Sequence, residues 1–238
     1  MIILRLENIS KTFGTLKVLN AINWEIHQGE FMVLVGPSGC GKTTLLNVIL
    51  GILEPDNGNI YFENQSLIDI PIEKRNIGFV PQDFGLFPHL SVYKNIIYGL
   101  KIRKLMQKAD SRVKDLISIL KLDGLEERKP NQLSWGQKQR AALARALAFN
   151  PTLLLLDEPM SAIDWRTREE ILKEIKDIQT NLRITTVYVT HNMQEALELG
   201  QRVTIMHEGR FEQCDPPEIL LKNPKTPFVT YFLSRYKA

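Results

Sequence analysis

The sequence is poor in cysteine and has no long apolar run. Its 238 residues include only two cysteines, Cys40 and Cys214, which exclude a disulfide framework and a cysteine-rich metal cluster and are typical of a reducing compartment. No stretch approaches the roughly 18–20 apolar residues that a membrane-spanning helix needs. Arg5 and Glu7 interrupt the N-terminal apolar stretch, which argues against a signal peptide. Any link to a membrane is therefore expected to run through a partner.

An excess of charge of one sign is also missing. The chain has 30 Lys and Arg against 27 Asp and Glu, a formal net charge of +3, and this balance gives no argument for nucleic-acid binding. Hydrophobic residues make up 44% of the chain, which is too much for a disordered protein. The length suits one large domain, or a core domain with a smaller lobe.

Short apolar runs alternate with helical patterns in the first and last parts of the chain. The run 31–35 is wholly apolar and predicts a buried strand, and 44–50 predicts a helix that ends at Gly51. Such alternation predicts an α/β fold with a mainly parallel core sheet. Further strands are predicted at 2–6, 24–26, 77–80, 153–156, 185–189 and 203–206, a turn at 56–58, and helices at 109–120 with Gly124 as C-cap, at 137–149, at 171–178 and near Glu195.

The middle of the chain has a different texture. From 83 to 150 the pattern is helical, which predicts a helical lobe inserted between two parts of a sheet domain, 1–82 and 151–238.

A glycine-rich loop follows the first buried strand. Gly36-Pro-Ser-Gly-Cys-Gly-Lys-Thr43 matches the pattern G-x-x-x-x-G-K-[ST]. Its glycines let backbone N–H groups approach phosphate oxygens, and the helix that follows adds its positive end. Lys42 is expected to reach the β- and γ-phosphates and Thr43 to ligate Mg²⁺; the alternative is a glycine-rich turn without a ligand. The predicted phosphate-binding residues are Gly36, Pro37, Ser38, Gly39, Cys40, Gly41, Lys42, Thr43 and Thr44.

Two carboxylates follow a second apolar run. Asp157 and Glu158 come directly after four leucines, where a buried strand should end and where ligands bind in open α/β sheets. Asp157 is placed to hold Mg²⁺, and Glu158 could polarise an attacking water as general base. The alternative is a solvated Asp-Glu pair that leads into a proline turn.

Together with four further motifs, these features resemble the ABC family of ATPases. Gln82 in Phe-Val-Pro-Gln-Asp matches the Q-loop of that family, and Leu133-Ser-Trp-Gly-Gln137 is close to its signature. Ser161-Ala-Ile-Asp164 matches the D-loop, and His191 after Val-Thr matches the switch histidine. The motifs stand in the order and at the separations usual for the family.

The resemblance implies the fold of a P-loop NTPase of the ABC type, with an antiparallel β subdomain and an inserted α-helical subdomain beside the parallel core. It also implies a homodimer in which two copies pair head to tail around two ATP molecules with Mg²⁺. Lys42, Gln82, Glu158 and His191 are then the catalytic residues, and Thr43, Gln82 and Asp157 the metal ligands. Ser134, Gly136, Gln137 and Asp164 reach the nucleotide across the interface, and Phe13 stacks on adenine where the family usually has Tyr.

Plainer interpretations remain for single residues. Phe13 could belong to the core, and Gln82 or His191 could be solvated surface residues. Trp135 departs from the family, which usually has Gly there; its ring either lies beside the nucleotide of the partner copy or faces the helical lobe. Cys40 lies at a helix N-terminus inside the loop, so either its alkylation blocks ATPase activity with protection by ATP, or it is a small residue that fits.

The segment 82–100 resembles the surface that takes a coupling helix from the permease in importers of this family. It contains Phe84, Phe87, Leu90 and Tyr93, and these side chains either form a docking groove or pack the lobe. The resemblance implies a peripheral ATPase at the cytoplasmic face of the membrane, with permease subunits as direct partners, a solute-binding protein as an indirect one, and no nucleic acid.

In length and motif wording the chain is most similar to short molybdate or tungstate importer ATPases, without a C-terminal regulatory domain. Importers of sulfate, iron or polyamines, and a soluble ABC ATPase that does not transport, are the alternatives.

Overall fold

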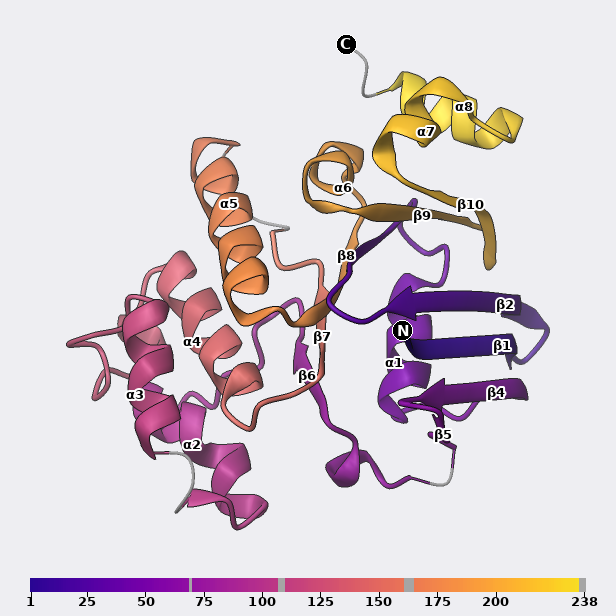
Figure 1. Ribbon diagram of the computed structural model, residues 1–238. Helices are drawn as coiled ribbons and strands as arrows, with labels where there is room; N and C mark the ends of the chain where they lie inside the picture. The colour runs from indigo at the N-terminus through magenta and orange to yellow at the C-terminus, as the bar shows by residue number, and fades with distance from the viewer. Residues whose placement is uncertain (69, 107–109, 161–164, 236–238) are drawn as a thin grey trace. The chain divides into compact units, whose positions relative to one another are not determined.

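The computed structural model describes residues 1–68, 70–106, 110–160 and 165–235, and the chain forms two compact units (Figure 1). The first unit joins Met1–Arg75 to Arg183–Ala238, and the second is Asn76–Leu182. Ala109 and the D-loop motif Ser161–Asp164 lie outside the described residues. In the described part of the chain, no helix is both long enough and apolar enough to cross a bilayer.

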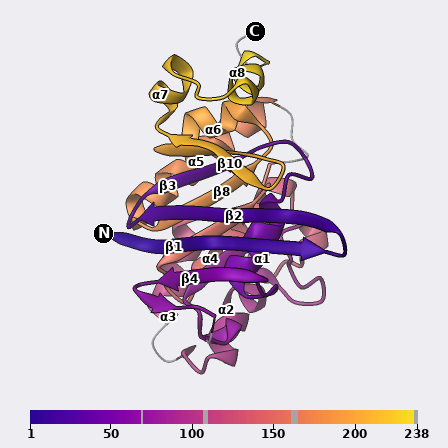
Figure 2. The ribbon, with the colours of Figure 1, turned by 90° about the vertical axis from the view of Figure 1, so that its right-hand side faces the viewer.

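An antiparallel sheet forms one layer of the first unit. Its strands are β1 (Ile2–Phe13), β2 (Leu16–His27), β4 (Asn57–Phe62) and β5 (Gln65–Ser66), in the order β2-β1-β4-β5. β1 and β2 run side by side as a long hairpin (Figure 2). Buried and solvent-accessible residues roughly alternate along β2, which is the pattern of a sheet with one face against the core. The antiparallel β part implied by the resemblance is confirmed.

The core strands of the first unit are β3 (Phe31–Val35), β8 (Thr185–Thr190), β9 (Arg202–His207) and β10 (Arg210–Asp215). They lie in the order β10-β9-β3-β8, and β3 is parallel to both of its neighbours. All residues of β3 and β8 are buried, as expected for parallel strands covered on both faces. β9 and β10 form an antiparallel hairpin.

Trp24 joins the two sheets of this unit. Its indole N–H donates to the Thr204 hydroxyl at 2.9 Å, and its ring meets that of Phe211 edge to face at 5.3 Å. A buried tryptophan whose N–H has a partner contributes its large apolar surface without leaving a polar group unsatisfied. The contact fixes β2 against β9 and β10.

In the described part of the first unit the α-helices are α1 (Lys42–Leu50), α6 (Met193–Leu199), α7 (Pro217–Lys222) and α8 (Pro227–Ser234). α1 ends at Gly51, whose φ of 82° is the left-handed conformation of a C-cap, as predicted. α8 begins at the N-cap Thr226, and the ring of Phe228 in α8 stacks on His207 of β9 at 3.7 Å.

The second unit contains two parallel strands and a group of helices. β6 (Ile77–Val80) pairs with β7 (Leu153–Asp157), and α4 (Trp135–Leu147) contacts β6, α2 (Val92–Ile102) and α3 (Asp110–Ile119). A further α-helix of this unit is α5 (Trp165–Leu182). The predicted helical texture of the chain between 83 and 150 is confirmed by α2, α3 and α4 (Figure 1).

Three local predictions are wrong. Asn57 and Gly58 belong to β4 instead of a turn, because Asp56 accepts hydrogen bonds from Lys11 and from the Thr12 N–H and so ties this segment to β1. α3 ends at Ile119, so Gly124 is not its C-cap. α4 begins at Trp135 and not at residue 137, since Ser134 supplies the N-cap.

Candidate functional site

The phosphate loop joins β3 to α1 in the first unit. Lys42 at the start of α1 is only 4% exposed, and its ammonium donates to the carbonyls of Gly36 at 2.9 Å and Pro37 at 3.0 Å. The N-cap Gly41 offers no side chain to the helix. The first backbone N–H groups of a helix have no intrahelical acceptor, and this helix end therefore suits an anion.

Gly36 fills a place where no side chain fits. A Cβ at this position would lie 2.2 Å from the carbonyl oxygen of Met206 and 2.9 Å from Cys40 Sγ. Cys40 itself is 7% exposed. This burial favours the interpretation of Cys40 as a small residue that fits the loop, whereas Ser38, Gly39 and Thr43 are exposed where a phosphate could be met. A loop with this backbone fits a nucleotide phosphate.

His191 lies beside the phosphate loop. β3 and β8 are parallel with Val35 opposite Thr190, so Gly36 and His191 leave the sheet at the same edge, from neighbouring strands. The His191 side chain is exposed. The structure therefore brings the predicted switch histidine and the predicted phosphate loop together.

A buried carboxylate holds the chain on both sides of His191. Glu195, 4% exposed, accepts hydrogen bonds at Oε2 from the hydroxyls of Thr190 at 2.7 Å and Tyr188 at 3.0 Å. The N–H of Asn192 donates to Thr190 Oγ1 at 3.0 Å, and the Asn192 side chain caps α6. Sequence reasoning missed this network; an acidic residue four positions after the histidine, among apolar neighbours, is the only signal for it.

Phe13 lies at the end of β1 and is 47% exposed. The alternative that it belongs to the core is therefore wrong. The Lys11 ammonium lies 5.8 Å from its ring centroid and 2.8 Å from Asp56, and this hydrogen bond holds the pKa of Asp56 below its ordinary value. An exposed aromatic face is available for stacking on a flat ring.

The second unit places Gln82, Asp157 and Glu158 at one edge. β6 and β7 are parallel with Val80 opposite Leu156, so the residues that follow the two strands leave the sheet together. Asp157 is 6% exposed, and Glu158 is half-buried with a φ of 43°. A non-glycine residue in the left-handed region is strained, and such strain is concentrated at functional sites.

The signature motif begins α4. Ser134 is exposed and is the N-cap; its hydroxyl accepts from the Gln137 N–H at 3.3 Å, and the Gln137 side chain accepts from the Ser134 N–H at 2.9 Å. Gly136 and Gln137 lie in the first turn. The ring of Trp135 meets the ring of Phe84 edge to face at 4.9 Å, and this contact favours the interpretation that Trp135 faces the helical lobe.

The segment 82–100 is built around Asn95. This side chain is fully buried and bonds the backbone of Phe87, Leu90 and Ser91. Phe84 is 6% exposed and packs the lobe, while Phe87 pairs with Tyr98, which is 39% exposed, at 4.4 Å. The segment therefore has a fixed shape, with part of its aromatic surface open.

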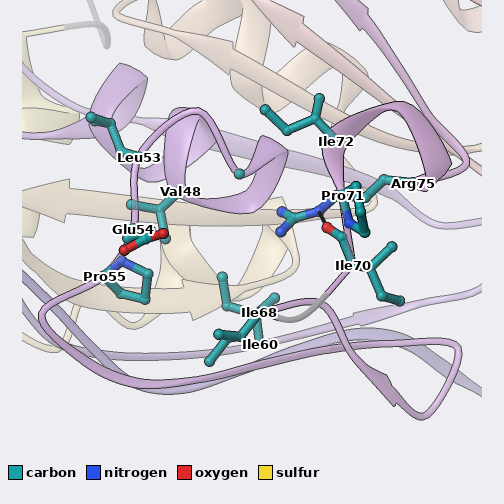
Figure 3. A pocket seen from close by; sticks show the side chains of 11 residues that line it. Val48, Leu53, Glu54, Pro55, Ile60, Ile68, Ile70, Pro71, Ile72 and Arg75 are labelled. Atoms are coloured by element: carbon teal, nitrogen blue, oxygen red, sulfur yellow. Dashed lines mark hydrogen bonds between the residues drawn. The ribbon is translucent and has the colours of Figure 1, made fainter.

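The first unit also contains a pocket of about 310 Å³, drawn in Figure 3. The Arg75 guanidinium in its wall donates to the carbonyls of Ile49, Leu67 and Ile70, and burial lowers the pKa of Arg75. None of the residues predicted for the nucleotide site lines this pocket. The lining residues are Val48, Gly51, Leu53, Glu54, Pro55, Ile60, Ile68, Ile70, Pro71, Ile72 and Arg75.

The predicted site residues thus fall into separate groups. The phosphate loop, His191 and Phe13 belong to the first unit; Gln82, Asp157, Glu158 and the signature residues belong to the second. Asp164 lies outside the described residues.

Comparison with known proteins extends this picture. The family model described as ABC transporter matches residues 19–161. The chain is 44% identical over 235 residues to a sulfate/thiosulfate import ATP-binding protein CysA of Bacillus cereus, covering 97% of this chain and 66% of that protein. It is 46% identical over 229 residues to the protein of the same name from Nephroselmis olivacea, covering 96% and 67%. The chain spans about two thirds of the length of these relatives.

Solved structures agree with the sequence relatives. A dimeric post-hydrolysis state of the ATP-binding cassette MJ0796, bound to ADP and Pi, has a TM-score of 0.76 at 32% identity and covers 90% of this chain and 98% of that chain. The ADP conformation of the cassette MJ1267 has a TM-score of 0.83 at 26% identity and covers 97% and 99%. The chain therefore belongs to the ABC transporter family and has the nucleotide-binding ATPase fold of its cassettes.

Proposed function

We propose that this chain is the ATP-hydrolysing motor of an importer for an inorganic oxyanion. The observation that carries the proposal is the phosphate loop that leads into the N-terminus of α1, in a chain whose signature residues begin a second helix, α4. The relatives named as sulfate/thiosulfate import proteins support the importer class and the oxyanion.

Binding of ATP follows from the first unit. The triphosphate lies on the loop from Gly36 to Thr44, with the backbone N–H groups and the Lys42 ammonium against its oxygens, and the adenine stacks on Phe13. Lys42 exchanges its carbonyl partners for phosphate oxygens, which are stronger acceptors because they are charged.

The donor atoms of the predicted ligands suit a magnesium ion. Thr43, Gln82 and Asp157 would hold it through a hydroxyl, an amide and a carboxylate oxygen, which are the donors that Mg²⁺ prefers alongside phosphate. When bound, Mg²⁺ neutralises charge on the phosphates.

In hydrolysis, three side chains act on the attacking water and the γ-phosphate. Glu158 takes the proton of the attacking water as general base, Gln82 helps to place that water, and His191 donates a hydrogen bond to the γ-phosphate. The left-handed backbone of Glu158 sets the direction in which its side chain leaves the main chain. The carboxylate therefore needs little movement during the reaction.

The complete site needs a second copy of the chain. Ser134, Gly136 and Gln137 of one copy meet the γ-phosphate on the loop of the other, because the exposed N-terminus of α4 attracts an anion. Asp164 of the D-loop is a further predicted contact of the nucleotide site. Closure then requires ATP, since the γ-phosphate is the group that both copies share. The dimeric state of the MJ0796 cassette supports this arrangement.

The open part of the segment 82–100 is the proposed contact for a permease helix, with Tyr98 and Phe87 offering aromatic surface. This contact would place the chain at the cytoplasmic face of the membrane as a peripheral subunit, with a solute-binding protein as an indirect partner. Sulfate or thiosulfate is the favoured cargo. The expectation of molybdate or tungstate gains no support from the relatives.

Two variants test the ATPase proposal. Glu158→Gln should bind Mg-ATP and lose about 10²–10⁴-fold in kcat, the usual contribution of a general base. Lys42→Ala should lose nucleotide affinity. Phosphate release measures kcat, and equilibrium binding of a fluorescent ATP analogue measures the affinity. Hydrolysis by Glu158→Gln at the wild-type rate would overturn the role of Glu158. An unchanged affinity in Lys42→Ala would overturn the role of Lys42.

Uptake of labelled oxyanions tests the cargo. A strain that lacks this chain should lose uptake of radiolabelled sulfate and keep that of molybdate. The remaining alternative is a soluble ABC ATPase without a transport role, which stimulation of the ATPase by DNA or ribosomes, and not by a co-purified permease, would favour.

A further inference from the structure

Phe84 adopts a backbone conformation that aromatic residues avoid. Its φ is 66°, and Gly85 follows with a φ of 56°. In this region Cβ crowds the backbone, so a bulky residue stays there only when its surroundings hold it. Phe84 and not glycine stands at the first position, and its ring is 6% exposed. The conformation is therefore imposed by contacts of the ring and the peptide groups.

Those contacts come from α4. The ring of Trp135, the first residue of the helix, meets the Phe84 ring edge to face at 4.9 Å with an interplanar angle of 75°. Near the other end of the helix, the Arg145 guanidinium donates to the carbonyl of Phe84 at 2.8 Å and to the carbonyl of Gly85. The signature helix thus holds this turn by an aromatic contact and by hydrogen bonds.

The turn held in this way contains Gln82. The N–H of Phe84 donates to the carbonyl of Pro81 at 2.9 Å, which makes Gln82 and Asp83 the central residues of a β-turn. The Asp83 carboxylate accepts from the Gly85 N–H at 3.1 Å. A displacement of Phe84 would therefore change the backbone from which the Gln82 side chain extends.

We propose that Trp135 is a positioning residue that couples the signature serine to Gln82 of the same copy. Ser134, directly before Trp135, is assigned to the ATP bound by the partner copy, whereas Gln82 is assigned to the ATP on the loop of its own copy. The Trp135–Phe84 contact therefore connects the two nucleotide sites of a dimer through one chain. This inference rests on the proposed function.

The choice of tryptophan has a physical reason. Two rings in edge-to-face contact attract each other beyond the area that they bury, and each ring has few rotamers to adopt. Glycine at 135 would leave Phe84 without its aromatic partner, and α4 would then hold Phe84 through the bonds of Arg145. The site of the partner copy could then close without moving the turn around Gln82.

A double-mutant cycle tests the coupling. Trp135→Gly should lower kcat by about 10-fold, because a small misplacement of a positioned group is costly, and should leave KM for ATP within about 2-fold. The Hill coefficient of ATP hydrolysis should fall to about 1. Phe84→Leu should act alike, and the double variant should be no worse than either single one. Trp135→Phe, which keeps a ring, should restore most of the activity.

Phe149→Leu is the matched control. It makes the same substitution as Phe84→Leu at another ring of the second unit, which contacts the Arg103 guanidinium at 4.1 Å, and should leave the Hill coefficient unchanged. Equal losses in Phe149→Leu, or additive losses in the cycle, would overturn the coupling. A wild-type chain without any ATPase activity would instead overturn the proposed function, on which the coupling rests. The failure of the coupling and the failure of the proposed function therefore give different results.

Hydrogen exchange gives a second measurement that does not depend on turnover. In the Glu158→Gln background, ATP should slow amide exchange in both 133–137 and 84–90. With Trp135→Gly added, the slowing in 133–137 should remain and that in 84–90 should be lost. Slowing that persists in 84–90 would contradict the proposed route through the two rings, whatever the effect of the variant on kcat.

Discussion

Gly36 leaves no room for a side chain. Gly36→Ala would force its Cβ to within 2.2 Å of the Met206 carbonyl, so the strand end and the loop must separate. We expect ATP affinity to fall by at least about 10-fold, since the N–H groups of the loop then point away from the phosphates. Titration with a fluorescent ATP analogue measures the loss.

Gly39→Ala is the control within the same loop. No atom lies within 4 Å of the added Cβ, but the φ of 80° makes alanine strained. We expect a stability cost of about 1 kcal/mol and a smaller loss of affinity than in Gly36→Ala. Equal losses in the two variants would show that backbone freedom, and not the contact with Met206, sets the requirement for glycine.

Glu195 allows stability and catalysis to be separated. Tyr188→Phe and Thr190→Val each remove one hydroxyl that donates to its buried carboxylate, and each should cost about 1–2 kcal/mol in the free energy of unfolding. Only Thr190 adjoins His191 and bonds the N–H of Asn192. Thr190→Val should therefore lower kcat several-fold more than Tyr188→Phe. Urea unfolding and steady-state ATPase assays measure the two effects; similar kcat values would contradict the positioning of His191 by Thr190.

At the scale of single residues, the sequence predicted the groups with a chemical role and did not predict the residues that hold them in place. Lys42, Asp157 and His191 stand in motifs whose spacing carries the prediction. Glu195 and Phe84 have no such motif, because the role of each depends on neighbours that the fold brings to it.

At the scale of elements, apolar strands were predictable and polar ones were not. β3 and β7 are buried along their whole length and have no polar residue before Asp157, so their sequence alone marks them. β10 reads Arg-Phe-Glu-Gln-Cys-Asp and is only partly buried; it forms because β9 offers it a hairpin partner. The start of α4 was misplaced by two residues because the capping role of Ser134 outweighed the apolar pattern.

The end of β10 carries a pH-dependent contribution to stability. Asp215 binds Lys225 at 2.8 Å, and this hydrogen bond, with a further one from Gln213, holds the pKa of Asp215 below its ordinary value of 3.8. The folded state then binds protons less readily than the unfolded state. The stabilisation is fully present at a pH above the pKa of Asp215 in the unfolded state. It is lost as the pH falls through the lower pKa of Asp215 in the folded state.

Asp215→Asn should therefore be less stable than the wild type at pH 7. The difference should shrink as pH falls below about 3.8. Urea midpoints between pH 2 and 7 measure it. Lys225→Met, which removes the partner of Asp215, should give a similar dependence. A difference from the wild type that is constant with pH in both variants would contradict the role of this ion pair.

For the whole molecule, the arrangement of functions follows from the division of the chain. The unit with the phosphate loop and the unit with the signature each carry only part of the proposed site. Ser134 is exposed at the start of its helix, and Thr43 is exposed on the loop. Both side chains can thus be reached by a second copy of the chain. The proposed function requires two copies to pair, and complementation between two variants tests this requirement.

Two inactive variants should complement each other if the copies pair head to tail. Both variants are made in the Glu158→Gln background. Lys42→Ala inactivates the phosphate loop of a copy, and Ser134→Arg inactivates its signature. A homodimer of either variant therefore has two defective sites. In a mixed dimer both lesions fall in one site and the other is intact. Random pairing of equal amounts makes half of the dimers mixed, so roughly a quarter of all sites should trap ATP.

Trapped radiolabelled ATP per dimer, isolated by gel filtration, gives the number of intact sites. Each variant alone should trap almost none, because every site then lacks either the Lys42 ammonium or the signature serine at the start of α4. A mixture that traps no more than its components would contradict sites shared between copies. Full trapping by the Ser134→Arg variant alone would instead mean that one copy binds its nucleotide without the signature of another.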